Sequence, residues 1–134
     1  MCLVGCANTP KSTFYEMQAS ACAGDVPSFF AHVDKVAIQT NAAKSMREPG
    51  ETAREAEAQT AEIMHTLFAV WEREVRKGER GMPCAMTYVA SRVNAQGDMG
   101  EVRIKDYKGE PMQWTFEKFG ERWFLVDIMA GQAP

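Results

Sequence analysis

The stretch MGEVRIKDYKGEPMQWTFEKFGERWFLVDIM, residues 99–129, decides the fold. Apolar and polar residues alternate along it, so that Val102 and Ile104 share one face of a predicted strand. Trp114 and Phe116 do the same in the next predicted strand. A period of two is typical of β-strands that bury one face. The stretch therefore predicts three strands, of which the first two pack one side on a core.

Short turns separate the predicted strands. Residues 108–110 form one turn, and Gly120-Glu121 is a glycine-first pair of the kind favoured in tight hairpins. Upstream, residues 84–93 are rich in strand formers, and the polar cluster 94–98 marks a further turn. The last strand, 123–129, is nearly all apolar, as expected of a strand that is covered on both faces. The pattern predicts a four-stranded antiparallel meander.

Helical periodicity precedes the sheet. The strongest pattern covers residues 53–77, where Thr52 and Glu55 form a capping box and Gly78 ends the run. We therefore expect an α+β fold, with N-terminal helices packed on the C-terminal sheet. Three shorter helices are expected after the N-cap residues Thr9, Asp25 and Asp34.

Composition narrows the function classes. The chain has 134 residues and a net charge of -3, and 9 Met and 3 Trp supply apolar volume for an adaptable, methionine-rich core. No part of the sequence concentrates Lys and Arg, and no apolar run is long enough to span a membrane. Nucleic-acid binding and membrane spanning are not expected. We expect one domain over residues 9–134, preceded by a separate segment over residues 1–8.

Two stretches resemble a known superfamily. Ala23-Gly24-Asp25 followed by Phe29-Phe30 resembles the turn between the first helices of the nuclear-transport-factor-like, cystatin-like superfamily. KFGERWFLVD, residues 118–127, resembles the closing hairpin of that fold. The resemblance implies a curved sheet that wraps around the helices as a cone. Its members include isomerases, dehydratases, binding proteins and dimerisation modules, so it implies shape more than activity.

The amino terminus carries a second resemblance. Leu3-Val4-Gly5-Cys6 resembles a bacterial lipobox, and the chain is similar above all to small bacterial lipoproteins with the cystatin-like fold. The resemblance implies acylation of Cys6 and a lipid-anchored protein of the cell envelope, with residues 1–8 as signal remnant and tether. The alternative is an accidental match in a cytoplasmic protein.

Aromatic and methionine side chains are the candidate ligand-binding residues. They could line a pocket between the long helix and the sheet, and the alternative is that they only pack in the core. The candidates are Met64, Trp71, Tyr88, Trp114, Phe116 and Trp123.

Candidate catalytic groups are few. His32 and His65 fall on predicted helices, where a surface or hydrogen-bonded histidine is the simpler reading. Asp127 alternates with Trp123 and Leu125 in the last strand and could be a buried acid, but a strand-end carboxylate near solvent is the simpler reading. The sequence has no metal-ligand spacing, phosphate loop or dinucleotide fingerprint, so we expect no catalytic residue, metal or cofactor.

Cys22 and Cys84 remain after processing at Cys6, and two interpretations stay open. They could form a disulfide in an oxidising compartment, closing a loop of about sixty residues. They could instead be buried thiols that fill the core. The distance between the Cα atoms of Cys22 and Cys84 decides between the two interpretations, because a disulfide needs less than about 7 Å.

Three functions are compatible with these patterns. The leading hypothesis is a non-enzymatic envelope lipoprotein domain that binds a partner protein or a small apolar ligand. The second is a soluble cone-fold enzyme, an isomerase or dehydratase, acting on a small hydrophobic substrate. The third is a homodimerisation module that pairs through the outer face of the sheet, where Gln113, Thr115 and Glu117 are expected.

Overall fold

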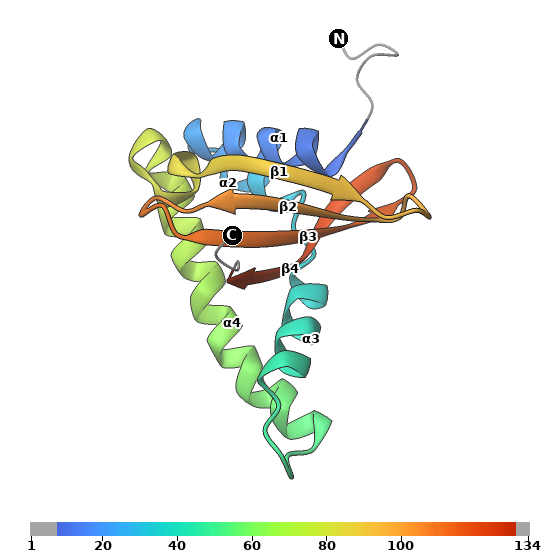
Figure 1. The fold of residues 1–134 in the computed structure, drawn as a ribbon. Coiled ribbons are helices and arrows are strands. Elements are labelled where there is room, and N and C mark those ends of the chain that lie inside the picture. The colour runs from blue at the N-terminus through green and yellow to red at the C-terminus, as the bar shows by residue number, and fades with distance from the viewer. Residues whose placement is uncertain (1–7, 131–134) are drawn as a thin grey trace.

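The computed structural model describes residues 8–130 and has an α+β fold, in which helices precede an open four-stranded sheet (Figure 1). The helical elements are α1 (Pro10–Cys22), α2 (Val26–Phe30), α3 (Lys35–Met46), α4 (Ala53–Arg76) and the 3-10 helices η1 (Gly78–Arg80) and η2 (Met82–Ala85). The strands are β1 (Thr87–Val93), β2 (Met99–Lys105), β3 (Pro111–Phe119) and β4 (Arg122–Ala130).

Each of the four α-helices begins after the N-cap residue that the sequence predicts. The capping box of α4 is confirmed, since the Glu55 N–H donates to Thr52 Oγ1 at 3.1 Å and the Thr52 N–H donates to Glu55 Oε1 at 3.2 Å. Thr9, Asp25 and Asp34 cap α1, α2 and α3. Each cap satisfies a backbone N–H that the helix leaves free.

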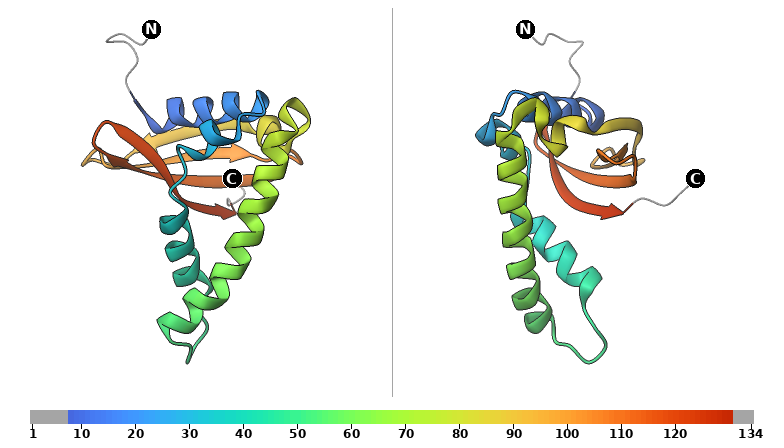
Figure 2. Two further views of the ribbon diagram at one scale, coloured as in Figure 1. Left: turned by 180° about the vertical axis from the view of Figure 1, so that it is seen from behind. Right: turned by 90° about the vertical axis from the view of Figure 1, so that its left-hand side faces the viewer.

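The sheet is the predicted antiparallel meander, with the strands paired in chain order. Its inner face is buried against the helices, and α1 runs along it (Figures 1 and 2). Gln113 and Thr115 alternate with the buried residues of β3 and therefore lie on the outer face. The buried residues of the inner face include Val102, Ile104, Trp114, Phe116, Trp123 and Leu125.

The first strand begins later than predicted. Residues 84–93 are expected to form one strand, but Cys84 and Ala85 belong to η2, and β1 begins at Thr87. Pro83 explains the difference, because its fixed φ suits the first turn of a helix and its missing N–H cannot join a sheet ladder.

A β-bulge overturns the predicted facing of Asp127. Thr115 pairs with Asp127, but the next residue, Phe116, pairs with Leu125, so Val126 is an extra residue in β4. One extra residue reverses the alternation. Asp127 therefore shares the outer face with Thr115 and not the inner face with Leu125.

The α3–α4 hairpin extends beyond the sheet, with its connecting loop at the far tip (Figure 2). Its base is joined to β4 by polar contacts, because the Asp34 N–H donates to the Leu125 carbonyl at 3.0 Å and Asn41 Nδ2 donates to the Val126 carbonyl at 2.8 Å. These contacts cover part of the edge of β4, which would otherwise present unpaired backbone groups.

The start of α1 lies directly against β2 at Gly100. This glycine is buried, and a Cβ added there would overlap the ring of Pro10. Because no side chain intervenes, the first turn of α1 can lie close to the sheet.

We predict that Gly100→Ala lowers the free energy of unfolding by about 1–3 kcal/mol, the usual cost of overpacking, as measured by urea denaturation. The added methyl group would meet Pro10 Cγ most closely and Pro10 Cβ at 3.2 Å. Pro10→Ala removes Cγ, so the double variant should recover part of the loss. A Gly100→Ala protein as stable as the wild type would contradict the close contact.

Candidate functional site

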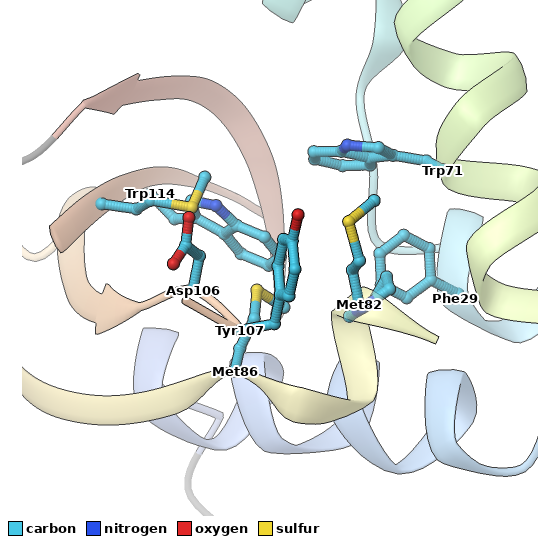
Figure 3. Close-up of a pocket in the computed structure, with 9 residues that line it drawn as sticks. Phe29, Trp71, Met82, Met86, Asp106, Tyr107 and Trp114 are labelled. Atoms are coloured by element: carbon cyan, nitrogen blue, oxygen red, sulfur yellow. The ribbon is translucent and has the colours of Figure 1, made fainter. Parts of the chain in front are cut away.

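A pocket of about 160 Å³ lies where one end of the sheet meets α2, α4 and η2 (Figure 3). Aromatic and methionine side chains form most of its wall, and the β2–β3 turn supplies the polar remainder. The lining residues are Phe29, Trp71, Met82, Pro83, Met86, Asp106, Tyr107, Met112 and Trp114.

Two tryptophans form the rigid part of the wall. Trp71 of α4 stacks on Trp114 of β3, with ring centroids 5.7 Å apart and planes inclined by 26°. Phe29 of α2 meets Trp71 edge-on at 5.9 Å. Such rings have few rotatable bonds, so the wall that they form is well defined.

The opposite wall is η2, which neighbouring helices hold through its backbone. Gln18 Nε2 of α1 donates to the carbonyls of Cys84 at 3.2 Å and Met86 at 2.5 Å. From α4, the Glu74 carboxylate accepts the Met82 N–H at 3.2 Å. The methionines of this wall are therefore attached to a fixed backbone.

The charge of Glu74 maintains one of these contacts. The Lys77 ammonium donates to its carboxylate at 2.5 Å and holds the pKa of Glu74 below its usual value, although burial acts in the opposite direction. Glu74 is consequently ionised at neutral pH and remains a strong acceptor for the Met82 N–H.

A disulfide joins Cys22, at the end of α1, to Cys84 in η2, with the Cα atoms 4.7 Å apart. The sequence leaves open whether these residues form a disulfide or remain buried thiols, and the structure has the disulfide. Because Cys84 follows Pro83 in the pocket wall, the bridge fixes this wall covalently to α1.

Three side chains bring polar atoms to the pocket. Asp106 Oδ1 accepts the N–H groups of Lys108 at 2.8 Å and Glu110 at 2.9 Å, so this carboxylate holds the β2–β3 turn. Tyr107 is half exposed. Trp114 is buried, and its Nε1 has no hydrogen-bond partner among residues 8–130.

Two of the six candidate pocket residues, Trp71 and Trp114, line this pocket. Tyr88 instead packs beside Tyr15 of α1. The other three candidates are buried in the core and do not line the pocket: Met64, Phe116 and Trp123.

Sequence reasoning missed part of the lining. Phe29 belongs to a short helix whose partner is far along the chain, and no local pattern reveals their contact. In the sequence, Asp106 and Tyr107 show only the pattern of a strand end and the turn that follows it. Met82 and Pro83 follow a glycine break. Pro83 is the sequence signal that the chain forms another element before it enters the sheet.

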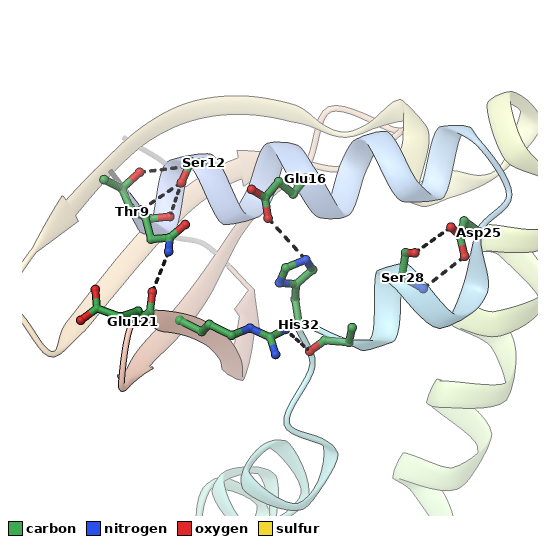
Figure 4. A network of polar contacts seen from close by, with 10 residues as sticks. Thr9, Ser12, Glu16, Asp25, Ser28, His32 and Glu121 are labelled. Carbon is green, nitrogen blue, oxygen red and sulfur yellow. Dashed lines mark hydrogen bonds and ion pairs between the residues drawn. The ribbon is translucent and has the colours of Figure 1, made fainter. Parts of the chain in front are cut away.

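The histidines lie elsewhere. His32 Nε2 is 3.5 Å from Glu16 Oε2 of α1 (Figure 4). Burial lowers the pKa of His32, the Glu16 charge opposes this shift and the Arg122 charge adds to it. His65 is exposed on α4. Neither histidine lines the pocket, whose titratable side chains are Asp106 and Tyr107.

Asp127 has its pKa raised by partial burial, although the Ile128 N–H donates to its carboxylate at 2.9 Å. It lies on the outer face of the sheet and does not line the pocket.

Within residues 8–130, no group of three or more His, Cys, Asp or Glu side chains is placed to hold a metal ion. None of the helices described is both long and apolar enough to cross a bilayer. Cys6, the predicted acylation site, lies outside the described residues. Comparison of the chain with protein-family models, curated proteins and solved structures found no match.

We predict that reduction of Cys22–Cys84 lowers the free energy of unfolding by about 4 kcal/mol, because the bridge restricts the unfolded chain over a long loop. Urea denaturation with and without dithiothreitol measures the difference. The Cys22→Ser/Cys84→Ser variant is the control, and its stability should not respond to the reductant. Equal stability of the oxidised and reduced wild type would contradict the prediction.

Proposed function

We propose that this domain binds a small apolar molecule in the pocket between α4, η2 and the sheet. The single observation that carries the proposal is the lining of this pocket, in which seven of nine residues are aromatic or methionine. Buried concave sites with few polar groups are typical of ligand-binding sites. Its volume of about 160 Å³ is close to that of an engineered apolar cavity of about 150 Å³ that binds benzene. One ring with a short substituent is the expected ligand size.

The wall supports binding more than catalysis. Its one carboxylate, Asp106, already accepts two backbone N–H groups of the neighbouring turn. Met82, Met86 and Met112 contribute flexible, polarizable side chains, which adapt to ligands of different outline. A cone-fold enzyme remains the alternative function, and a dimer through the outer sheet face is a third.

We further propose the cystatin-like cone as the finer description of this fold and the bacterial envelope as its location. The Cys22–Cys84 disulfide supports an extracytoplasmic address, because disulfides persist in oxidising compartments such as the periplasm. The lipobox-like residues before Cys6 support attachment by acyl chains.

Toluene titration tests the binding proposal. We expect the indole ¹H–¹⁵N resonances of Trp71 and Trp114 to shift and saturate in the oxidised protein. The Trp123 resonance should stay unchanged, since its Nε1 donates to the Asn8 carbonyl outside the pocket. At ten times Kd, toluene should add about 1.4 kcal/mol to the free energy of unfolding.

A pocket-filling variant sharpens this test. Met86→Trp adds volume inside the pocket and should abolish the saturable shifts. The control Met129→Trp adds the same group at an exposed site on β4 and should preserve them. Wild-type resonances that do not saturate, or that saturate equally in Met86→Trp, would rule out binding in this pocket.

Mass spectrometry after expression from the native gene tests the anchor. Each buried CH₂ of an acyl chain contributes about 0.8 kcal/mol to membrane attachment. We expect the protein to fractionate with membranes and to carry a lipid mass on Cys6, and Cys6→Ser to abolish both. Recovery of an unmodified, soluble wild-type protein would exclude lipidation.

A further inference from the structure

We propose that the pocket selects molecules that combine an apolar ring with one neutral oxygen acceptor, and that Trp114 Nε1–H donates a hydrogen bond to that oxygen. The inference rests on the proposed function, because it specifies which apolar molecules the same pocket takes.

The Trp114 donor is unusual within this protein. Its side chain is 1% exposed, and among residues 8–130 Nε1 is the buried side-chain polar atom that has no hydrogen-bond partner. Trp123, which is also buried, donates from Nε1 to the Asn8 carbonyl at 3.0 Å. Native proteins pair nearly all buried donors, since a donor without an acceptor loses its hydration and gains nothing in return.

Trp114 lines the pocket, which puts its indole beside any ligand that the pocket takes. The Trp114 indole lies within the group of side chains that line it (Figure 3). The methionine thioethers beside it are weak acceptors. Asp106 Oδ1 accepts the turn N–H groups, and neither Asp106 nor any other described group makes a hydrogen bond to Trp114 Nε1. A ligand oxygen would therefore supply what the described side chains do not.

The charge of the pocket restricts the acceptor further. Asp106 places a carboxylate in the lining, and no Lys or Arg lines the pocket to offset it. A ligand carboxylate would meet a like charge in a site of low polarity, which disfavours it strongly. A carbonyl, ether or hydroxyl oxygen carries no such cost. The geometry thus points to neutral, singly oxygenated ring compounds.

Acetophenone and ethylbenzene form a matched pair, since they have nearly the same shape and differ in one carbonyl oxygen. Both dissociation constants are measured by tryptophan fluorescence in the wild type, in Trp114→Phe and in Trp123→Phe. We expect Trp114→Phe to weaken acetophenone by about tenfold relative to ethylbenzene, the size of an ordinary net hydrogen bond. Any change in pocket volume affects both ligands and cancels in the ratio. Trp123→Phe, outside the pocket, should leave the ratio unchanged.

An unchanged ratio in Trp114→Phe would overturn the inference while the binding function stands. Failure of both ligands to bind the wild type would overturn both. A second readout needs no variant and serves if Trp114→Phe does not fold. In the wild type, the Trp114 indole proton resonance should move downfield with acetophenone and not with ethylbenzene. Equal shifts with the two ligands would also overturn the inference.

Discussion

The stack of Trp71 on Trp114, with ring centroids 5.7 Å apart, joins the helical layer to the sheet. Phe14 of α1 meets the same indole edge-on at 5.7 Å, so Trp114 receives contacts from two helices that begin far apart in the chain. An aromatic side chain of this size removes about 150–250 Å² from water. Trp114 therefore contributes to the positions of both α1 and α4 on the sheet, and the pocket lies beside this contact.

A second constraint acts on η2, which closes the pocket. Without partners, this short 3-10 helix would be a weak element, because its hydrogen bonds are few and poorly aligned. Three contacts from outside compensate: the disulfide from Cys22, the side chain of Gln18 and the carboxylate of Glu74. One of these contacts is covalent, so it ties η2 directly to the end of α1.

The polar network of α1, α2 and β4 has a different role (Figure 4). His32 faces Glu16, and Arg122 donates to the Ala31 carbonyl at 3.2 Å, so these charged groups join neighbouring elements. They lie outside the apolar pocket. The contact with Glu16 gives His32 a structural role, whereas His65 is exposed on α4.

Features that depend on near neighbours in the chain follow from the sequence alone. Thr52 and Glu55 define the start of α4 within one helical turn, and the alternation around Trp114 defines the buried face of β3. Other features depend on contacts between distant segments. The bulge at Val126 reverses the facing of Asp127 because strand pairing, not local pattern, sets the register.

The pocket likewise depends on distant contacts, such as that of Phe29 with Trp71, and on gaps that large rings leave when they pack. Neither a register nor a gap is encoded in one segment, because each is a property of two or more elements after they meet.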